Sequence, residues 1–145
     1  MKKSLILLLS GTIFSSTVNA GGQAVIPHFL VSSFSNCSLS ISNISTSDVQ
    51  VDIELIDQTG TSVVPSSVNY YAFEGKNPVA QSVTLGAKKT GAILFQNSQN
   101  WLNGYGYISW TSSDLINGAL VANMHCNNST SDMQREVTIN GGKAF

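Results

Sequence analysis

Charged side chains are scarce in this chain, where Asp, Glu, Lys and Arg together account for 10% of 145 residues. No segment gathers lysine and arginine into a basic stripe, so nothing is available to neutralise a run of phosphates or to hold an anionic membrane surface. We therefore expect no nucleic-acid partner. A disordered chain is excluded as well, because 42% of the residues are hydrophobic.

Long apolar runs are also missing, apart from one compact stretch near the start. A helix that spans a bilayer needs about 20 apolar residues, so we expect no transmembrane segment. The stretch follows Lys2 and Lys3 and leads to a small-residue exit of the Val-x-Ala kind at Val18 and Ala20. This order of positive head, apolar stretch and small residues predicts a secretory signal peptide over residues 1–20, cut after Ala20.

Export determines the expected compartment. Paired lysines before a compact apolar stretch are typical of bacterial exported proteins, so we place the mature chain, residues 21–145, in the periplasm or outside the cell. No cysteine stands at the cut, which argues against a lipid anchor. Removal of Lys2 and Lys3 leaves five basic residues against eight acidic ones, a formal net charge of −3.

Helical periodicity is almost absent, whereas alternation of apolar and polar residues recurs along the chain. In residues 35–44, Cys37, Leu39 and Ile41 share one face while serines occupy the other. Residues 49–56 alternate in the same way. Further strands are predicted at 63–65, 82–85, 90–95, 105–111, 116–126 and 135–140.

Seven or eight short strands separated by turns predict an all-β protein. We expect an antiparallel β-sandwich, immunoglobulin-like or jelly-roll-like, formed by a single domain over residues 21–145. Abundant Ser, Thr, Asn, Gly and Val together with low charge are typical of exported β-proteins.

Cysteine is limited to Cys37 and Cys126. In an oxidising compartment an even pair indicates a disulfide, which for a loop of this length contributes roughly 4–5 kcal/mol in the chain-entropy model. Cys37 lies near the start of an early strand and Cys126 at the end of a late one, both on the apolar face. Because antiparallel neighbours bring such ends together, we expect the disulfide inside the core or at one end of it. Free thiols or metal ligands are the alternatives.

Catalytic motifs are missing as well. No Gly-x-Ser-x-Gly elbow occurs. Asp52 and Glu54 share the outer face of one predicted strand, where solvated residues are expected rather than an acid–base pair. His28 and His125 are the two candidates for a metal site, although such a site needs three or four ligands. We therefore expect neither enzyme activity nor a cofactor.

Aromatic residues provide the best lead to a binding function. Three rings, Phe73 among them, cluster in residues 66–78, which we expect to form a long loop with some edge pairing. Three more, Trp101, Tyr105 and Tyr107, cluster in or near a loop rich in Asn and Gln. Rings surrounded by amides suit sugar binding, since a ring face packs on C–H groups while amides bond hydroxyls; the alternative is that about half of the rings fill the core. The candidate ligand-binding residues are Tyr70, Tyr71, Trp101 and Tyr105.

Several segments resemble small β-sandwich modules of bacterial exported proteins, many without an assigned activity. Residues 25–29 (VIPHF) match their Ile-Pro-His-Phe-like opening, and residues 51–60 match their alternating strand that ends in Asp-x-x-Gly. A fainter likeness exists to the sensory rhodopsin transducer family, a compact oligomeric β-sandwich. The signal peptide and the cysteine pair depart from that family, so no signalling role is carried over. The other segments that match the exported β-sandwich modules are residues 37–43, 83–87, 106–110 and 119–122.

Fimbrial subunits are a second resemblance, in export, size, all-β character and a single disulfide. The cysteines of this chain lie farther apart than theirs, and residues 140–145 lack the usual penultimate tyrosine. Three functions therefore stay open. The leading one is a non-enzymatic exported protein that binds a cell-surface or matrix component such as carbohydrate. The others are a fimbria-like structural subunit that forms a homo-oligomer, and a small metal-binding or hydrolytic periplasmic protein.

Overall fold

The computed structural model describes residues 20–98 and 100–145, which form ten strands and a short 3₁₀ helix. None of these residues forms a helix long and apolar enough to cross a membrane. The elements are β1 (Ala20–Val31), β2 (Ser35–Asn43), β3 (Val49–Asp57), β4 (Ser62–Val63), β5 (Ser67–Tyr71), β6 (Val83–Leu85), β7 (Thr90–Gln96), β8 (Leu102–Ser112), β9 (Leu120–Asn128), β10 (Ser131–Thr138) and η1 (Asn140–Gly142).

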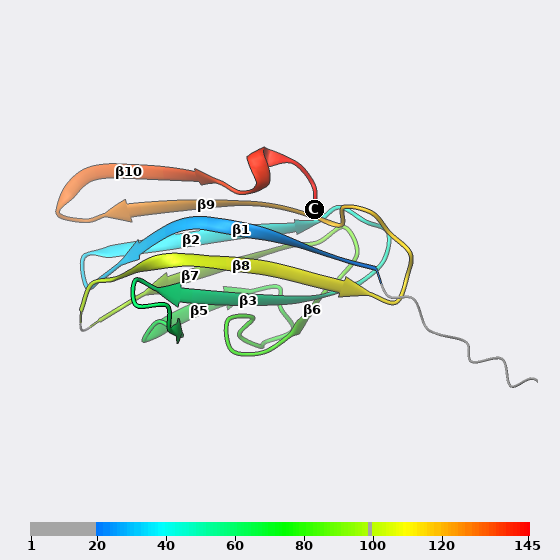
Figure 1. Cartoon of the computed structure of the whole chain (residues 1–145), viewed down its shortest axis with the longest axis horizontal. Helices are drawn as coiled ribbons and strands as arrows, with labels where there is room; N and C mark the ends of the chain where they lie inside the picture. Colours follow the sequence, from blue (N-terminus) through cyan, green and yellow to red (C-terminus); the bar gives the residue numbers. More distant parts are fainter. Residues whose placement is uncertain (1–19, 99) are drawn as a thin grey trace, which may run out of the picture.

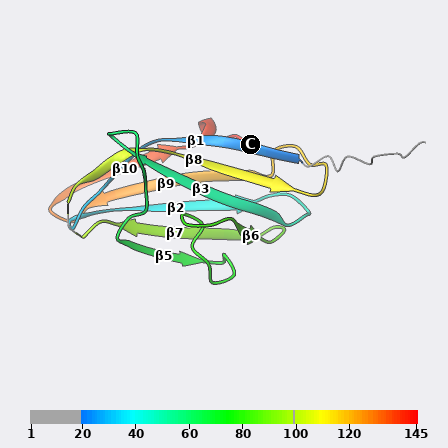
Figure 2. The same ribbon diagram turned by 60° about the horizontal axis from the view of Figure 1, so that its bottom comes forward.

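The strands form two stacked antiparallel sheets of five strands each (Figures 1 and 2). Sheet A has the order β1-β8-β3-β4, with β6 also paired to β3, and sheet B has the order β10-β9-β2-β7-β5. The expected antiparallel β-sandwich is thereby confirmed, with ten strands in place of seven or eight. β1 is one edge strand of sheet A and β10 is one edge strand of sheet B, and these two lie on the same side of the sandwich (Figure 1).

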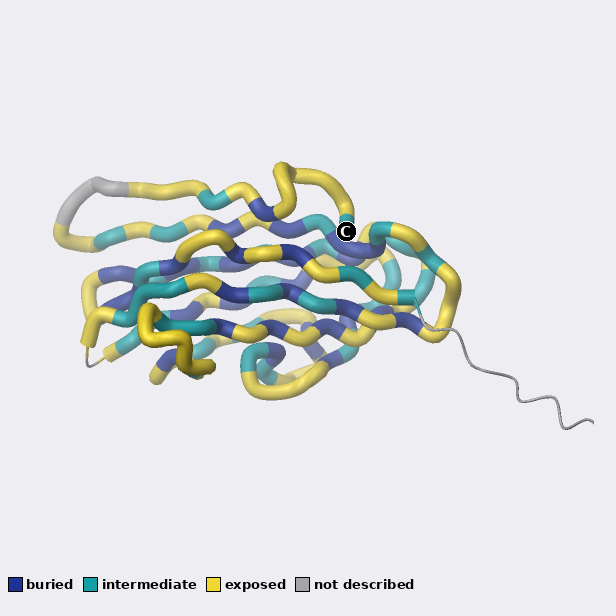
Figure 3. The backbone as a smooth tube through the Cα atoms, in the orientation of Figure 1, coloured by how far each residue is buried: buried dark blue, intermediate teal, exposed yellow. Residues whose placement is uncertain are grey.

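Buried and exposed residues alternate along the strands, as Figure 3 shows. In β3 the side chains of Val49, Val51, Ile53 and Leu55 are buried, as the alternation predicts. The expected boundaries of the late strands are less accurate. The strand predicted at 116–126 begins only at Leu120, because Gly118 adopts a positive φ of 64° and turns the chain.

β1 is the longest strand, and the sequence prediction missed it. Gly21, Gly22 and Pro27 weaken the strand pattern, since glycine and proline are poor strand residues. A Cβ at Gly22 would lie 2.6 Å from the indole nitrogen of Trp110, and one at Gly21 would lie 2.9 Å from its carbonyl oxygen. The close approach of Trp110 therefore requires glycine. Pro27 lies within a β-bulge of this edge strand, where its missing N–H is tolerated.

Phe73 belongs to the core, although the sequence groups it with a cluster of loop aromatics. Its side chain is fully buried. A Cβ at Gly91 would lie 2.3 Å from the Phe73 ring, so glycine in β7 makes room for this phenylalanine. Phe29 and Phe95 meet edge to face at 6.1 Å and link the two sheets. The phenylalanines of the core therefore come from two strands, β1 and β7, and from the β5–β6 connection.

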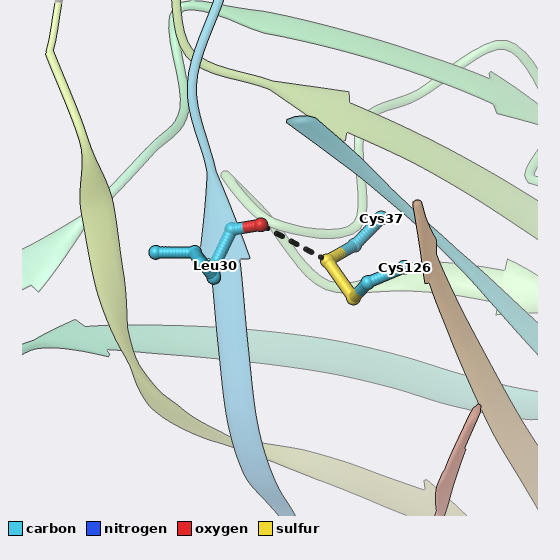
Figure 4. The surroundings of a disulfide bond; sticks show 3 residues. All are labelled: Leu30, Cys37 and Cys126. Atoms are coloured by element: carbon cyan, nitrogen blue, oxygen red, sulfur yellow. Dashed lines mark hydrogen bonds between the residues drawn. A yellow bond between two sulfur atoms is a disulfide. The ribbon is translucent and has the colours of Figure 1, made fainter. Parts of the chain in front are cut away.

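The disulfide between Cys37 and Cys126 joins directly opposed residues of β2 and β9. Their Cα atoms are 4.0 Å apart, and Cys37 is completely buried. Figure 4 shows the Cys37 sulfur facing β1, where it lies 3.6 Å from the carbonyl oxygen of Leu30. This is a packing contact, because a disulfide sulfur carries no proton. The bond thus lies in the core at one end of it, as expected, and joins strands 89 residues apart in sequence.

The two ends of the sandwich are named here after Phe34 and Asn43. The Phe34 end carries the connections β1–β2, β3–β4, β4–β5, β7–β8 and β9–β10, and lies on the left in Figure 1. The Asn43 end carries the connections β2–β3, β6–β7 and β8–β9 together with the C-terminal residues.

The Asn43 side chain ties together the connections at its end. It is 1% exposed, and its amide nitrogen donates to the carbonyl oxygens of Ser47, Leu85 and Gly86 at 2.8 to 3.1 Å. Its amide oxygen accepts from the backbone N–H and the hydroxyl of Ser45. One buried side chain therefore links main-chain groups of two connections through its own hydrogen bonds.

We expect Asn43→Ala to lower the free energy of unfolding by about 2–3 kcal/mol, because it removes the buried hydrogen bonds that link the β2–β3 and β6–β7 connections. Asn123→Ala is the matched control, since Asn123 is exposed on β9 and its loss should change stability by no more than about 0.5 kcal/mol. Urea unfolding followed by circular dichroism measures both values. Equal effects of the two substitutions would contradict the role given to Asn43.

Candidate functional site

Two connections cross between the sheets side by side at the Phe34 end. Residues 32–34 lead from β1 to β2, and the β7–β8 connection leads back from sheet B to sheet A. Val31 pairs with Leu102 in sheet A, and Asn36 pairs with Gln96 in sheet B. Because both pairs of flanking strands are neighbours, the two connections are held next to each other.

Each of these connections presents one exposed aromatic side chain. Phe34 is 54% exposed and Trp101 is 62% exposed, so both rings are largely in solvent. Trp101 was a sequence candidate, whereas Phe34 was missed. The sequence did contain a signal for it: Phe34 is a single aromatic residue in a serine-rich turn, and such a turn is rarely part of a core.

Hydrogen bonds fix the backbone beneath Phe34. The carbonyl oxygen of Phe34 accepts from the N–H of Ser129 at 2.8 Å and from its hydroxyl at 3.0 Å. The amide of Gln96 donates to the carbonyl oxygen of Ser33 at 3.0 Å. The β1–β2 connection is therefore bonded both to the β9–β10 turn and to the end of β7.

The connection that carries Trp101 is bonded in a similar way. The N–H of Ser98 donates to the hydroxyl of Ser66 at 2.8 Å, and the amide nitrogen of Asn97 donates to the carbonyl oxygen of Asn100 at 2.8 Å. Rings held on a fixed backbone lose less conformational freedom when a ligand binds. Hydrogen bonds thus hold the backbone at Phe34 and the described residues 97, 98 and 100 that precede Trp101.

The connections at the Phe34 end contain no charged residue among residues 32–34, 58–61, 64–66, 97–101 and 129–130. Asp57 precedes one of them, and its carboxylate accepts hydrogen bonds from the hydroxyl and N–H of Thr59 and from the N–H of Thr61. These bonds, with the Thr59 hydroxyl first, lower the pKa of Asp57 and hold the β3–β4 turn. The surface around the two rings therefore offers amides and hydroxyls.

The structure does not gather the other candidate aromatics around Trp101. Tyr70 faces inward from β5, opposite buried Ile93. Tyr71 is 69% exposed on the outer face of sheet B. Tyr105 is on the outer face of sheet A, edge to face with Tyr107 at 5.8 Å. Strand alternation separates Tyr70 from Tyr71, and the core separates both from Tyr105.

The two histidines also lie apart. His125 is exposed on the outer face of β9, whereas His28 lies in the bulge of β1 and faces the disulfide side of sheet B. No three side chains of the His, Cys, Asp and Glu types come together among residues 20–98 and 100–145. Asp52 and Glu54 are exposed on the outer face of sheet A, where a solvated pair was expected.

A cleft opens beside the Phe34 end, between β1 and the β9–β10 pair. Its volume is about 50 Å³, and its lining includes His28, Ser35, Cys126 and Arg135. The sequence offered no signal for it, because its walls come from four separate strands.

Comparison of the chain with models of protein families, with curated proteins and with solved structures finds no match. The function must therefore be argued from the geometry of the molecule itself.

Proposed function

We propose that this chain is an exported, non-enzymatic binding protein of the cell envelope, and that its Phe34 end recognises an uncharged carbohydrate. The observation that carries the proposal is the pair of solvent-exposed rings, Phe34 and Trp101, on neighbouring connections. Exposed large apolar side chains that share one surface are typical of binding sites. Aromatic faces pack against the C–H groups of a sugar ring, while amides and hydroxyls bond its hydroxyls.

The chemistry of the connections supports recognition rather than catalysis. They contain neither a carboxylate nor an imidazole, which are the usual groups for proton transfer. They also contain no lysine or arginine, so an anionic polymer is a poorer fit than a neutral one.

Export to the periplasm or the cell exterior is part of the proposal. It is supported by the signal-peptide pattern of residues 1–20, of which residues 1–19 lie outside the described part. The Cys37–Cys126 disulfide agrees with an oxidising compartment. A chain in that compartment can meet envelope or matrix polysaccharides directly.

Alanine substitutions at the two rings test the carbohydrate proposal on a glycan array. Phe34→Ala and Trp101→Ala should each weaken binding by at least about tenfold, as expected for central aromatic contacts. Leu115→Ala is the control, since Leu115 is 78% exposed but lies in the β8–β9 connection at the Asn43 end. Binding that survives both ring substitutions, or that falls equally in the control, would rule the proposal out.

A structural subunit is the second candidate function, and the position of β1 at an edge of sheet A, paired with β8 alone among the described strands, favours it. Residues 20–27 carry no charge, although charged residues commonly protect an exposed sheet edge from pairing with another chain. For an assembling subunit, light scattering after size-exclusion chromatography should find dimers or larger species that Val25→Lys abolishes. A strictly monomeric mature chain would remove this candidate and leave carbohydrate binding untouched.

A further inference from the structure

The gap between β1 and β10 is filled near one end of the sandwich. At the Asn43 end the C-terminal residues occupy it: the N–H of Phe145 donates to the carbonyl oxygen of Leu120, and the indole N–H of Trp110 donates to the carbonyl oxygen of Phe145 at 2.6 Å. Near the Phe34 end the cleft opens instead, beside the Cys37–Cys126 disulfide. This disulfide is the covalent clamp between β2 and β9, so the clamp lies next to an opening in the surface.

The two cysteines of the clamp differ in exposure. Cys37 is 0% exposed, and on its β1 side the carbonyl oxygen of Leu30 lies 3.6 Å from the sulfur (Figure 4). Cys126 is only partly buried, and it belongs to the lining of the cleft. A reagent that enters from solvent through the cleft therefore meets Cys126 first.

The size of the cleft limits what can enter it. Its volume of about 50 Å³ is several times the roughly 10–15 Å³ that one water molecule needs. A thiol group with its methylene can enter such a space, while the rest of the reagent stays in solvent. The cleft therefore suits an attacking group rather than a whole bound molecule.

Two nitrogen-bearing side chains line the same cleft. Arg135 is directly opposite Cys126 in the β9–β10 ladder, so their side chains point to the same face of sheet B, and His28 approaches from the bulge of β1. No carboxylate is among the described residues that line the cleft. A nearby cation favours the thiolate, which is the reactive form of a thiol. A thiol with a further negative charge is therefore the reagent that this opening favours.

We propose that the clamp exchanges with small anionic thiols through Cys126. The incoming thiolate attacks the Cys126 sulfur, and the bond between the two cysteines breaks. A mixed disulfide then joins the reagent to Cys126, while Cys37 leaves with the electron pair of the broken bond and takes up a proton from water. A second thiolate completes the reduction. This site is independent of the carbohydrate surface proposed above, since the exchange uses neither of its rings.

One electrostatic effect acts in the opposite direction. A sulfur leaves faster when its thiolate is stabilised, and Arg135 would stabilise Cys126 as the leaving group after attack on Cys37. Solvent screens an exposed charge, so this effect is worth roughly fivefold in rate. Attack on a fully buried sulfur, in contrast, requires the strands over it to open first, which costs about a thousandfold or more. Access therefore decides in favour of Cys126.

Peptide mapping of the half-exchanged protein tests the point of attack. The folded, disulfide-bonded chain is treated with 2-mercaptoethanesulfonate without denaturant, quenched with acid and then unfolded, so that N-ethylmaleimide labels every free thiol. We expect the thiol reagent on Cys126 and the maleimide on Cys37 in at least about nine of ten half-exchanged molecules. The reverse labelling, or an equal mixture, would overturn the proposal.

The rate of reduction provides a second readout that does not require the mixed disulfide to accumulate. Through an accessible sulfur, reduction of the folded chain should be proportional to the thiol concentration and exceed the rate of global unfolding, measured separately in denaturant and extrapolated to water. A clamp that is reduced only as fast as the chain unfolds would show that the cleft gives no access to it.

Thiols of opposite charge test the contribution of Arg135 at low ionic strength. Per thiolate, 2-mercaptoethanesulfonate should reduce the clamp about threefold faster than 2-aminoethanethiol, because the local cations attract the anionic reagent. The formal net charge of −3 for residues 21–145 by itself predicts the opposite order. Arg135→Met should abolish most of the preference, whereas Lys76→Met, a charge-matched control at an exposed residue of the β5–β6 connection, should keep it. An equal loss in both variants would contradict a local effect at Cys126.

Discussion

The pairing of β2 with β9, fixed by the bond between Cys37 and Cys126, is the constraint on which the other features of the molecule depend. β2 is the central strand of sheet B, with β9 on one side and β7 on the other. The bond joins directly opposed residues, so it fixes the register of this ladder. The Cys37 sulfur also packs against the carbonyl oxygen of Leu30 in β1, so the disulfide helps to position β1 over sheet B. The disulfide also lies near the Phe34 end, where β2 begins and β9 finishes.

The two ends of the sandwich differ: hydrogen bonds close the Asn43 end, whereas the Phe34 end carries the proposed binding surface. At the Asn43 end a buried amide pairs with main-chain groups, and the C-terminal residues close the gap between the edge strands. At the Phe34 end two aromatic rings are left in solvent and the gap stays open as a cleft. Binding proteins commonly carry their binding residues on connections between rigid strands. The folded scaffold already orders these connections, so less conformational entropy is lost when a ligand binds.

Most of the fold could be predicted from the sequence, whereas much of the candidate site could not. Alternation identified β2 and β3, and export together with paired cysteines predicted the disulfide. β1 was missed because its glycines are required by the distant Trp110, which no local pattern reveals. Phe34 and Phe73 look equivalent in sequence, yet one is exposed and the other is buried, since burial depends on the tertiary partner.

Unfolding of the mature protein in denaturant, with the disulfide intact and after reduction, tests the central role of the clamp most directly. Cys37 and Cys126 are 89 residues apart, so reduction should lower the free energy of unfolding by roughly 4–5 kcal/mol and move the midpoint accordingly. Coincident unfolding curves for the oxidised and reduced forms would contradict the account, because the β2–β9 ladder would then hold the sandwich without the bond.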